Sequence, residues 1–145
     1  MQWTEDGELL SASRMLTVSI CSDNLNAVPL TLVEIDRKSD VYSHVDVMDM
    51  LAGKTLIKAD GSEHPVEEVL RDVKLVALYF SAHWCPPCRH FTPILADAYA
   101  EVKESLPCAQ VIFVSLDHSK EDMMNYMEDC HGDWYAIPYE DPCRE

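Results

Sequence analysis

The amino-acid sequence predicts an α/β fold in which buried parallel strands alternate with helices. Residues 74–80 and 110–116 are almost continuous apolar runs, which are typical of strands covered on both faces, as in a parallel sheet. The stretch 86–105 between them has apolar side chains spaced by three and four, which predicts a long helix. A strand, a helix and a second strand in this order favour a right-handed crossover.

The long helix is expected to pack on the sheet through one apolar stripe. Pro93 lies inside the helix and predicts a kink there, because proline lacks the backbone N–H that the helix ladder needs. The stripe consists of Cys88, Phe91, Leu95, Ala98, Tyr99, Val102 and Leu106.

Shorter elements surround this unit. Residues 54–58 read as a short strand, and Pro65 stands at the start of a short helix. Ser119 is a candidate cap for a helix that ends near Cys130. Residues 131–145 are rich in Pro, Trp and Tyr and are expected to form an irregular loop.

Residues 1–47 have a different character. The segments 15–21 and 29–35 have strand-like patterns and could pair as a small hairpin, and residues 36–40 resemble a linker. The sequence therefore predicts two parts, a poorly defined N-terminal extension over 1–47 and a partial α/β domain over 48–145.

The chain is acidic, with 11 Lys and Arg residues against 26 Asp and Glu residues in 145, and its formal net charge is −15. Nucleic acids and anionic membranes are polyanions, so the charge argues against both as main partners. Residues 1–13 lack the basic start and apolar run of a secretory signal, and no stretch approaches the roughly 18 apolar residues of a membrane span. We therefore expect a cytoplasmic or nuclear location, where a close cysteine pair is more often catalytic or metal-binding than a permanent cross-link.

The pair Cys85 and Cys88 follows a predicted buried strand and opens the long helix. A helix N-terminus presents unpaired N–H groups and positive potential, which stabilise a thiolate over a thiol. The spacing predicts that Cys85 attacks a disulfide and that Cys88, one helical turn further on, resolves the mixed disulfide. Thiol–disulfide exchange is therefore the chemistry that these residues favour.

Four neighbouring residues are expected to shape this site. Trp84 would shield one side of the Cys85 sulfur. Pro86 and Pro87 stiffen the turn at positions where backbone donors are otherwise unpaired. Arg89 adds a positive charge.

Two alternatives stay open for the cysteine pair. A zinc site can be written from Cys85, Cys88, His90, Cys130 and His131, although a second close pair is missing and the last two residues are adjacent. A structural pair without chemistry is the other alternative, because buried cysteines also pack as small hydrophobes.

The segment around this pair resembles the nucleoredoxin and tryparedoxin branch of the thioredoxin superfamily, whose site reads Trp-Cys-Pro-Pro-Cys. The resemblance, closest to the nucleoredoxin-like proteins, covers about residues 48–142 and does not reach 1–47. It is carried by the stretches 48–53, 79–93, 111–117 and 132–141.

The resemblance implies a thioredoxin-like fold and protein-disulfide reductase activity in cell redox homeostasis, with Cys85 as nucleophile and Cys88 as resolving thiol. No bound cofactor is implied, and the reducing equivalents would come from a cellular thiol system. The partners would then be protein disulfide substrates or a thiol reductant. For the nucleoredoxin-like proteins the resemblance also implies a role in maintaining photoreceptors and other sensory neurons, where some short members act as trophic factors rather than as enzymes.

The sequence departs from this family in two ways. Tyr79 stands where thioredoxin has a buried acid, although tyrosine is usual in the nucleoredoxin branch. The sequence given ends at Glu145, before the cis-proline strand, the last hairpin strand and the final helix of the family, so we expect a C-terminally truncated fold. In that fold one edge of strand 74–80 is unpaired and invites self-association, unless the N-terminal hairpin covers it.

Overall fold

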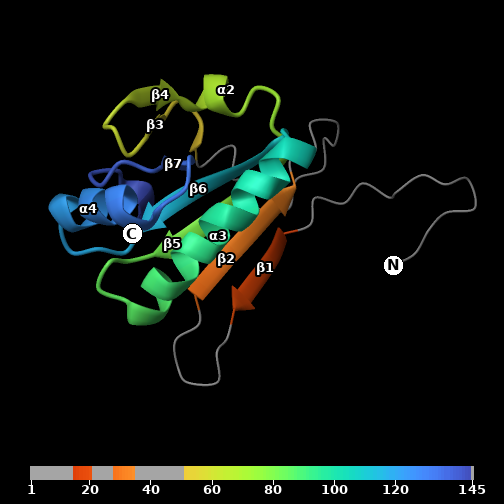
Figure 1. Cartoon of the computed structure of the whole chain (residues 1–145). Coiled ribbons are helices and arrows are strands. Elements are labelled where there is room, and N and C mark those ends of the chain that lie inside the picture. Colours follow the sequence, from red (N-terminus) through yellow and green to blue (C-terminus); the bar gives the residue numbers. More distant parts are fainter. Residues whose placement is uncertain (1–14, 21–27, 35–50, 145) are drawn as a thin grey trace, which may run out of the picture.

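The structure is a computed structural model that describes residues 15–20, 28–34 and 51–144, the first two ranges by their backbone only. Its centre is a mixed seven-stranded sheet with the strand order β1-β2-β5-β6-β7-β3-β4 (Figure 1). The linker expected at 36–40, the residue Cys21 and the boundary expected between 47 and 48 lie outside the described residues. The helices in the described ranges are all too short or too polar to cross a lipid bilayer.

The middle of the sheet is a parallel pair joined by a long helix. Strand β5 (Leu75–Ser81) runs parallel to β6 (Ala109–Ser115) over seven paired residues, from Leu75 opposite Ala109 to Ser81 opposite Ser115. Helix α3 (Pro86–Ser105) connects them and continues through Pro93, and Figure 1 shows it lying across one face of the sheet. The predicted strand–helix–strand unit is confirmed, with each strand displaced by one residue from its predicted bounds.

The remaining strands make the sheet mixed rather than purely parallel. Strand β7 (Tyr135–Ala136) is parallel to β6, whereas β3 (Thr55–Ile57) runs antiparallel to β7 and to β4 (Glu63–Pro65). Helix α2 (Val66–Val69) follows β4 directly. Helix α4 (Lys120–Cys130) begins at the predicted cap, where the Ser119 hydroxyl accepts the N–H of Asp122 at 3.1 Å.

An N-terminal hairpin covers the edge of β5. Strands β1 (Met15–Ile20) and β2 (Val28–Glu34) pair antiparallel, and β2 pairs antiparallel with β5 from Leu30 opposite Tyr79 to Glu34 opposite Leu75. The expectation that this edge of β5 is unpaired is therefore wrong. The physical reason is that β2 supplies the backbone partners that β5 needs, so self-association through this edge loses its basis.

The sheet separates two apolar cores, because alternate residues of β5 and β6 point to opposite faces. One core lies beneath α3 and α4, where Tyr79 of β5 and Phe113 of β6 are both fully buried. The other lies on the face that α2 covers. Its buried members are Leu51, Leu56, Val66, Leu70, Val73, Val76, Leu78, Ile112, Val114 and Ile137.

The stripe predicted for α3 is only half correct. Cys88 and Tyr99 are buried, but Val102 and Leu106 are each more than 40% exposed. Thr92, which the apolar pattern leaves out, is fully buried instead. The reason is that a network of hydrogen bonds takes up the polar atom of Thr92, so a polar side chain occupies the inner face of the helix.

The expectation of an irregular loop over 131–145 is only partly correct. This stretch contains β7 and a single 3-10 turn, η1 (Pro142–Arg144). The fully buried Trp134 and Ile137 anchor it to the two cores. A two-residue strand is too short to show the period of two by which strands are recognised.

Candidate redox site

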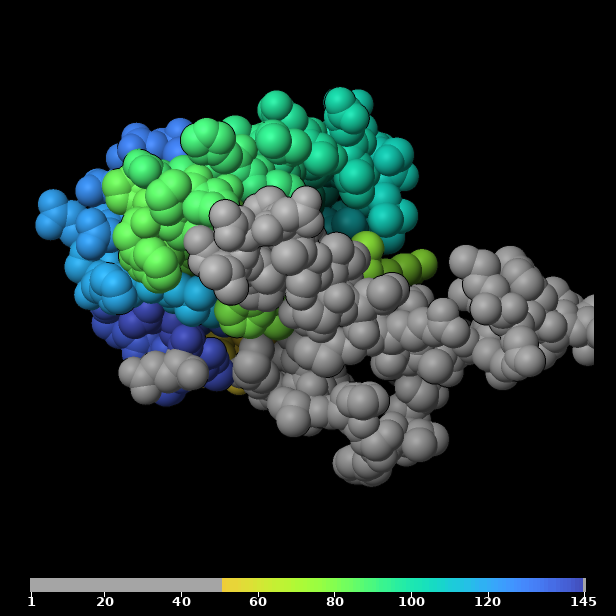
Figure 2. Space-filling view, turned by 90° about the horizontal axis from the view of Figure 1, so that it is seen from below, coloured from red at the N-terminus to blue at the C-terminus, as the bar shows by residue number. Residues whose placement is uncertain are grey.

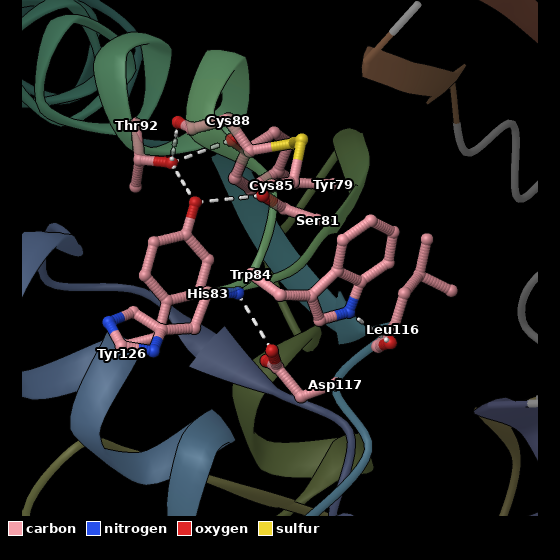
Figure 3. The surroundings of a disulfide bond; sticks show 10 residues. All are labelled: Tyr79, Ser81, His83, Trp84, Cys85, Cys88, Thr92, Leu116, Asp117 and Tyr126. Carbon is pink, nitrogen blue, oxygen red and sulfur yellow. Dashed lines mark hydrogen bonds between the residues drawn. A yellow bond between two sulfur atoms is a disulfide. The ribbon is translucent and has the colours of Figure 1, made fainter. Parts of the chain in front are cut away.

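The cysteine pair lies where β5 passes into α3 (Figure 3). Cys85 is the residue that caps α3, and its backbone N–H donates to the carbonyl of Ala82 at 3.2 Å. The two sulfurs form a disulfide, with the Cα atoms 5.3 Å apart. Cys85 is half-buried and Cys88 is only 5% exposed, so the first sulfur lies nearer to solvent.

The disulfide lies at the N-terminus of α3, which is the positive end of the helix dipole. Pro86 and Pro87 occupy its first two positions, and neither has a backbone N–H. The first turn, which the structure describes in full, contains no acidic side chain. The exposed residue Arg89 donates its backbone N–H to the carbonyl of Cys85 at 3.1 Å. The helix dipole therefore stabilises a negative charge on the Cys85 sulfur, and no carboxylate in the first turn of α3 counteracts this effect.

The side chain of Trp84 contacts the segment that follows β6. Its indole Nε1–H donates to the carbonyl of Leu116 at 3.1 Å, and its ring stacks on His118 with the centroids 5.7 Å apart. The indole is nevertheless 58% exposed. Figure 2 shows the loop that carries it at the surface, next to the blue segment that leads into α4. The site thus presents a fixed aromatic surface beside Cys85.

The carboxylate of Asp117 holds the same loop from beneath, and the sequence analysis did not single it out. One oxygen accepts the backbone N–H of His83 at 2.7 Å, and the other accepts the hydroxyl of Ser115 at 2.9 Å. The Ser115 hydroxyl also accepts the backbone N–H of Asp117 at 3.0 Å. The side chain is only 3% exposed, so these bonds replace the water that a surface carboxylate would bind.

Four buried hydroxyl groups lie beneath the disulfide, and the sequence analysis singled out only that of Tyr79 (Figure 3). The Thr92 hydroxyl lies 2.8 Å from the hydroxyl of Tyr79 and donates to the carbonyl of Cys88 at 2.7 Å. It also bonds the hydroxyl of Tyr126, which lies 2.8 Å from the hydroxyl of Ser81. Burial raises the pKa of Tyr126, so this phenol stays neutral at physiological pH.

An aromatic cluster behind this network contains the imidazole of His131, a partly buried residue whose ring Nε2 is shielded from solvent. The ring of His131 packs edge-on against Phe113 and Tyr126, with centroid distances of 4.3 and 4.5 Å. Its Nδ1 accepts the indole N–H of Trp134 at 3.0 Å. Burial lowers the pKa of His131 to about 3, so the imidazole is neutral at physiological pH.

The structure gathers the residues that the sequence analysis placed at this site. They are Trp84, Cys85, Pro86, Pro87, Cys88 and Arg89. Within the described ranges, no three His, Cys, Asp or Glu side chains are placed to hold a metal ion, so the zinc set around His90, Cys130 and His131 does not form there. Cys108, Cys130 and Cys143 are the described cysteines outside the disulfide.

Comparisons with known proteins agree with this geometry. Residues 72–145 match a family model described as thioredoxin-like. Human nucleoredoxin is 45% identical over 69 residues, which cover 48% of this chain and 15% of that protein. Tryparedoxin of Trypanosoma brucei brucei is 42% identical over 67 residues, which cover 46% of this chain and 44% of that protein. The chain thus spans a small part of the nucleoredoxins that it matches, between 14% and 21% of their length.

Solved structures show the same likeness. The crystal structure of thioredoxin from Wuchereria bancrofti superposes with a TM-score of 0.61 and 51% identity, over 65% of this chain and 64% of that one. Native tryparedoxin I from Crithidia fasciculata superposes with a TM-score of 0.55 and 35% identity, over 63% of this chain and 61% of that one. In each case under two thirds of the neighbour is matched.

Proposed function

Because this chain belongs to the thioredoxin-like family, with nucleoredoxins and tryparedoxins among its homologues, we propose that it reduces protein disulfides through Cys85 and Cys88. The observation that carries the proposal is the disulfide at the N-terminus of α3, directly after a buried parallel strand. A cysteine at such a helix end is favoured as the thiolate, which is the form that attacks a disulfide.

The reaction begins from the reduced pair. The Cys85 thiolate attacks one sulfur of the substrate disulfide, forms a mixed disulfide and expels the other substrate sulfur as a thiolate, which takes a proton from water. The Cys88 thiolate then attacks the Cys85 sulfur, which forms the Cys85–Cys88 disulfide and expels the second substrate thiolate. Two electrons pass from the cysteine pair to the substrate. A cellular dithiol or thiol reductant returns the pair to its starting state.

The difference in exposure between the two sulfurs supports this division of roles. Cys85 is half-buried at the surface beside the exposed indole of Trp84, where a substrate disulfide can reach it. Cys88 is buried one turn inside the helix, where it meets the Cys85 sulfur more readily than it meets an incoming molecule. The exchange uses only cysteine side chains, so the proposal calls for no bound cofactor.

We place this activity in redox homeostasis of the cytoplasm or nucleus, where thiol systems keep such pairs reduced. The negative charge of the chain supports a protein or small thiol as the partner rather than a nucleic acid. The described residues hold no observation that favours the alternative, a non-enzymatic trophic factor for photoreceptor maintenance.

The proposal is tested by the reduction of insulin disulfides with dithiothreitol as the reductant. Cys85→Ser should abolish turnover, and Cys88→Ser should accumulate a mixed disulfide that mass spectrometry detects. Cys108→Ser is the matched control, because this cysteine lies outside the disulfide, and it should leave turnover unchanged. Unchanged activity in Cys85→Ser would exclude the proposed mechanism.

A further inference from the structure

The four hydroxyls beneath the disulfide form one chain that ends on the backbone of Cys88. Ser81 and Tyr79 come from β5, Thr92 from α3 and Tyr126 from α4. All four side chains are at most 1% exposed. The network therefore ties three elements of the fold to the residue that carries the inner sulfur.

The direction of each hydrogen bond follows from counting protons, because a hydroxyl group donates only once. Thr92 donates to the carbonyl of Cys88, so it must accept from both Tyr79 and Tyr126. Tyr126 has then used its proton on Thr92, and it must accept from Ser81. Every proton of the network is assigned, and one arrangement satisfies all four groups. A chain of bonds aligned in this way is cooperative.

The anchor point is a turn of α3 that needs support. Pro93 has no backbone N–H, so the carbonyl of Arg89 lacks its usual partner four residues on. The Thr92 hydroxyl adds a bond to the carbonyl of Cys88, one residue before that gap. The backbone that carries the inner sulfur is therefore held by a side chain where the helix ladder is weakest.

From this geometry we propose that Thr92 and Tyr126 are positioning residues for Cys88. The inference rests on the function proposed above, because it concerns the resolving step of that reaction. The network fixes the backbone of Cys88 so that its sulfur lies ready to attack the Cys85 sulfur. This preorganisation favours the disulfide over the dithiol and speeds the release of the mixed disulfide. The neutral phenol of Tyr126 acts by its fixed dipole and not as a base.

The first test is the equilibrium between the dithiol and the disulfide in glutathione buffers. Thr92→Val and Tyr126→Phe should each lower the equilibrium constant for disulfide formation about fivefold, which corresponds to a network that stabilises the disulfide over the dithiol by about 1 kcal/mol. Thr92→Ser keeps the hydroxyl and should restore the constant. Tyr99→Phe is the matched control, because Tyr99 lies buried on the same helix outside the network, and it should change nothing. If Tyr126→Phe and Thr92→Val both behave like Tyr99→Phe, the proposal is wrong.

The second test separates an effect on Cys88 from a general loosening of the site. In a Cys88→Ser background, Thr92→Val should leave the rate at which Cys85 attacks a small disulfide unchanged. With Cys88 present, Thr92→Val should slow release of the mixed disulfide about fivefold. Slower attack by Cys85 in the Cys88→Ser background would overturn the proposal. Both tests use small thiols and disulfides, so they remain decisive if the protein fails to reduce insulin.

Discussion

The carboxylate of Asp117 accepts the backbone N–H of His83 at 2.7 Å, two residues before Cys85. The bond joins the end of β6 to the loop that leads into α3, and the carboxylate is almost completely buried. The loop before the outer cysteine is therefore held by a side chain from the segment that follows β6.

Replacing Asp117 should loosen this loop. Asp117→Ala leaves the N–H of His83 and the hydroxyl of Ser115 without their acceptor, so we expect a loss of about 1–3 kcal/mol in the free energy of unfolding. Asp117→Asn retains an acceptor oxygen for the N–H of His83, so its loss in the free energy of unfolding should be smaller than that of Asp117→Ala. Urea unfolding measures both losses. Equal stability of Asp117→Ala and the parent chain would contradict the role of the carboxylate.

The partly buried imidazole of His131 should make the fold sensitive to acid. Its pKa of about 3 lies below the ordinary value of 6.5, so the unfolded chain binds a proton between these values and the folded chain does not. The neutral imidazole therefore contributes fully to the free energy of unfolding above pH 6.5, and this contribution is lost as the pH falls toward 3. It changes by about 1.4 kcal/mol per pH unit in that window, or about 2 kcal/mol between pH 7 and pH 5.

His131→Gln removes the titrating group and keeps an oxygen that can accept the indole N–H of Trp134. Urea unfolding at pH 7 and at pH 5 should therefore give a difference in stability about 2 kcal/mol smaller than in the parent chain. The exposed His90 supplies the control, because His90→Gln should leave the pH dependence as it is. The idea fails if both variants show the pH dependence of the parent.

Arg144 should stabilise the end of β6 through its guanidinium fork. Its Nη1 donates to the carbonyls of Ser115 and Asp117 at 3.0 and 3.1 Å, and its Nε donates to the carbonyl of Tyr139 at 3.0 Å. A lysine cannot span these acceptors, so Arg144→Lys should destabilise the fold by about 1–2 kcal/mol in urea unfolding. The same change at the exposed Arg71 should have no measurable effect. If Arg144→Lys and Arg71→Lys lose similar amounts of unfolding free energy, the guanidinium of Arg144 does not stabilise the fold in this way.

Much of the fold was predictable because the central elements carry strong patterns. The apolar runs of β5 and β6 are buried on both faces, and the helix between them begins at Pro86, as the two prolines and the apolar spacing indicate. The position of Cys85 and Cys88 follows from those elements. The placement of the redox pair thus needed only the strand, the turn and the helix N-terminus.

The network around the site was not predictable from these patterns. Thr92 and Ser81 are polar residues that ordinarily favour the surface, and their burial depends on partners from other elements. Asp117 likewise acts across the sheet on a loop 34 residues away. The pairing of β2 with β5 is a contact between segments about 45 residues apart, and local periodicity carries no signal for such pairing.

That pairing gives a test of the N-terminal hairpin. β2 has a strand on both sides, whereas β1 lies at the end of the sheet. Proline removes a backbone donor and is tolerated far better at an edge than inside a sheet. Leu32→Pro, opposite Ala77 of β5, should therefore destabilise the chain more than Thr17→Pro in β1. Urea unfolding should show a loss in the free energy of unfolding of about 3 kcal/mol for Leu32→Pro. The loss for Thr17→Pro should be smaller.

Hydrogen exchange then locates the loss. The amides of β5 should lose protection in Leu32→Pro and keep it in Thr17→Pro, because β2 is the hairpin strand that pairs with β5 and β1 does not pair with β5. The amides of β6 are the internal reference, since they pair with β5 and β7 and not with the hairpin. If Leu32→Pro leaves the exchange of β5 unchanged, β2 does not supply the partner strand of β5 in solution.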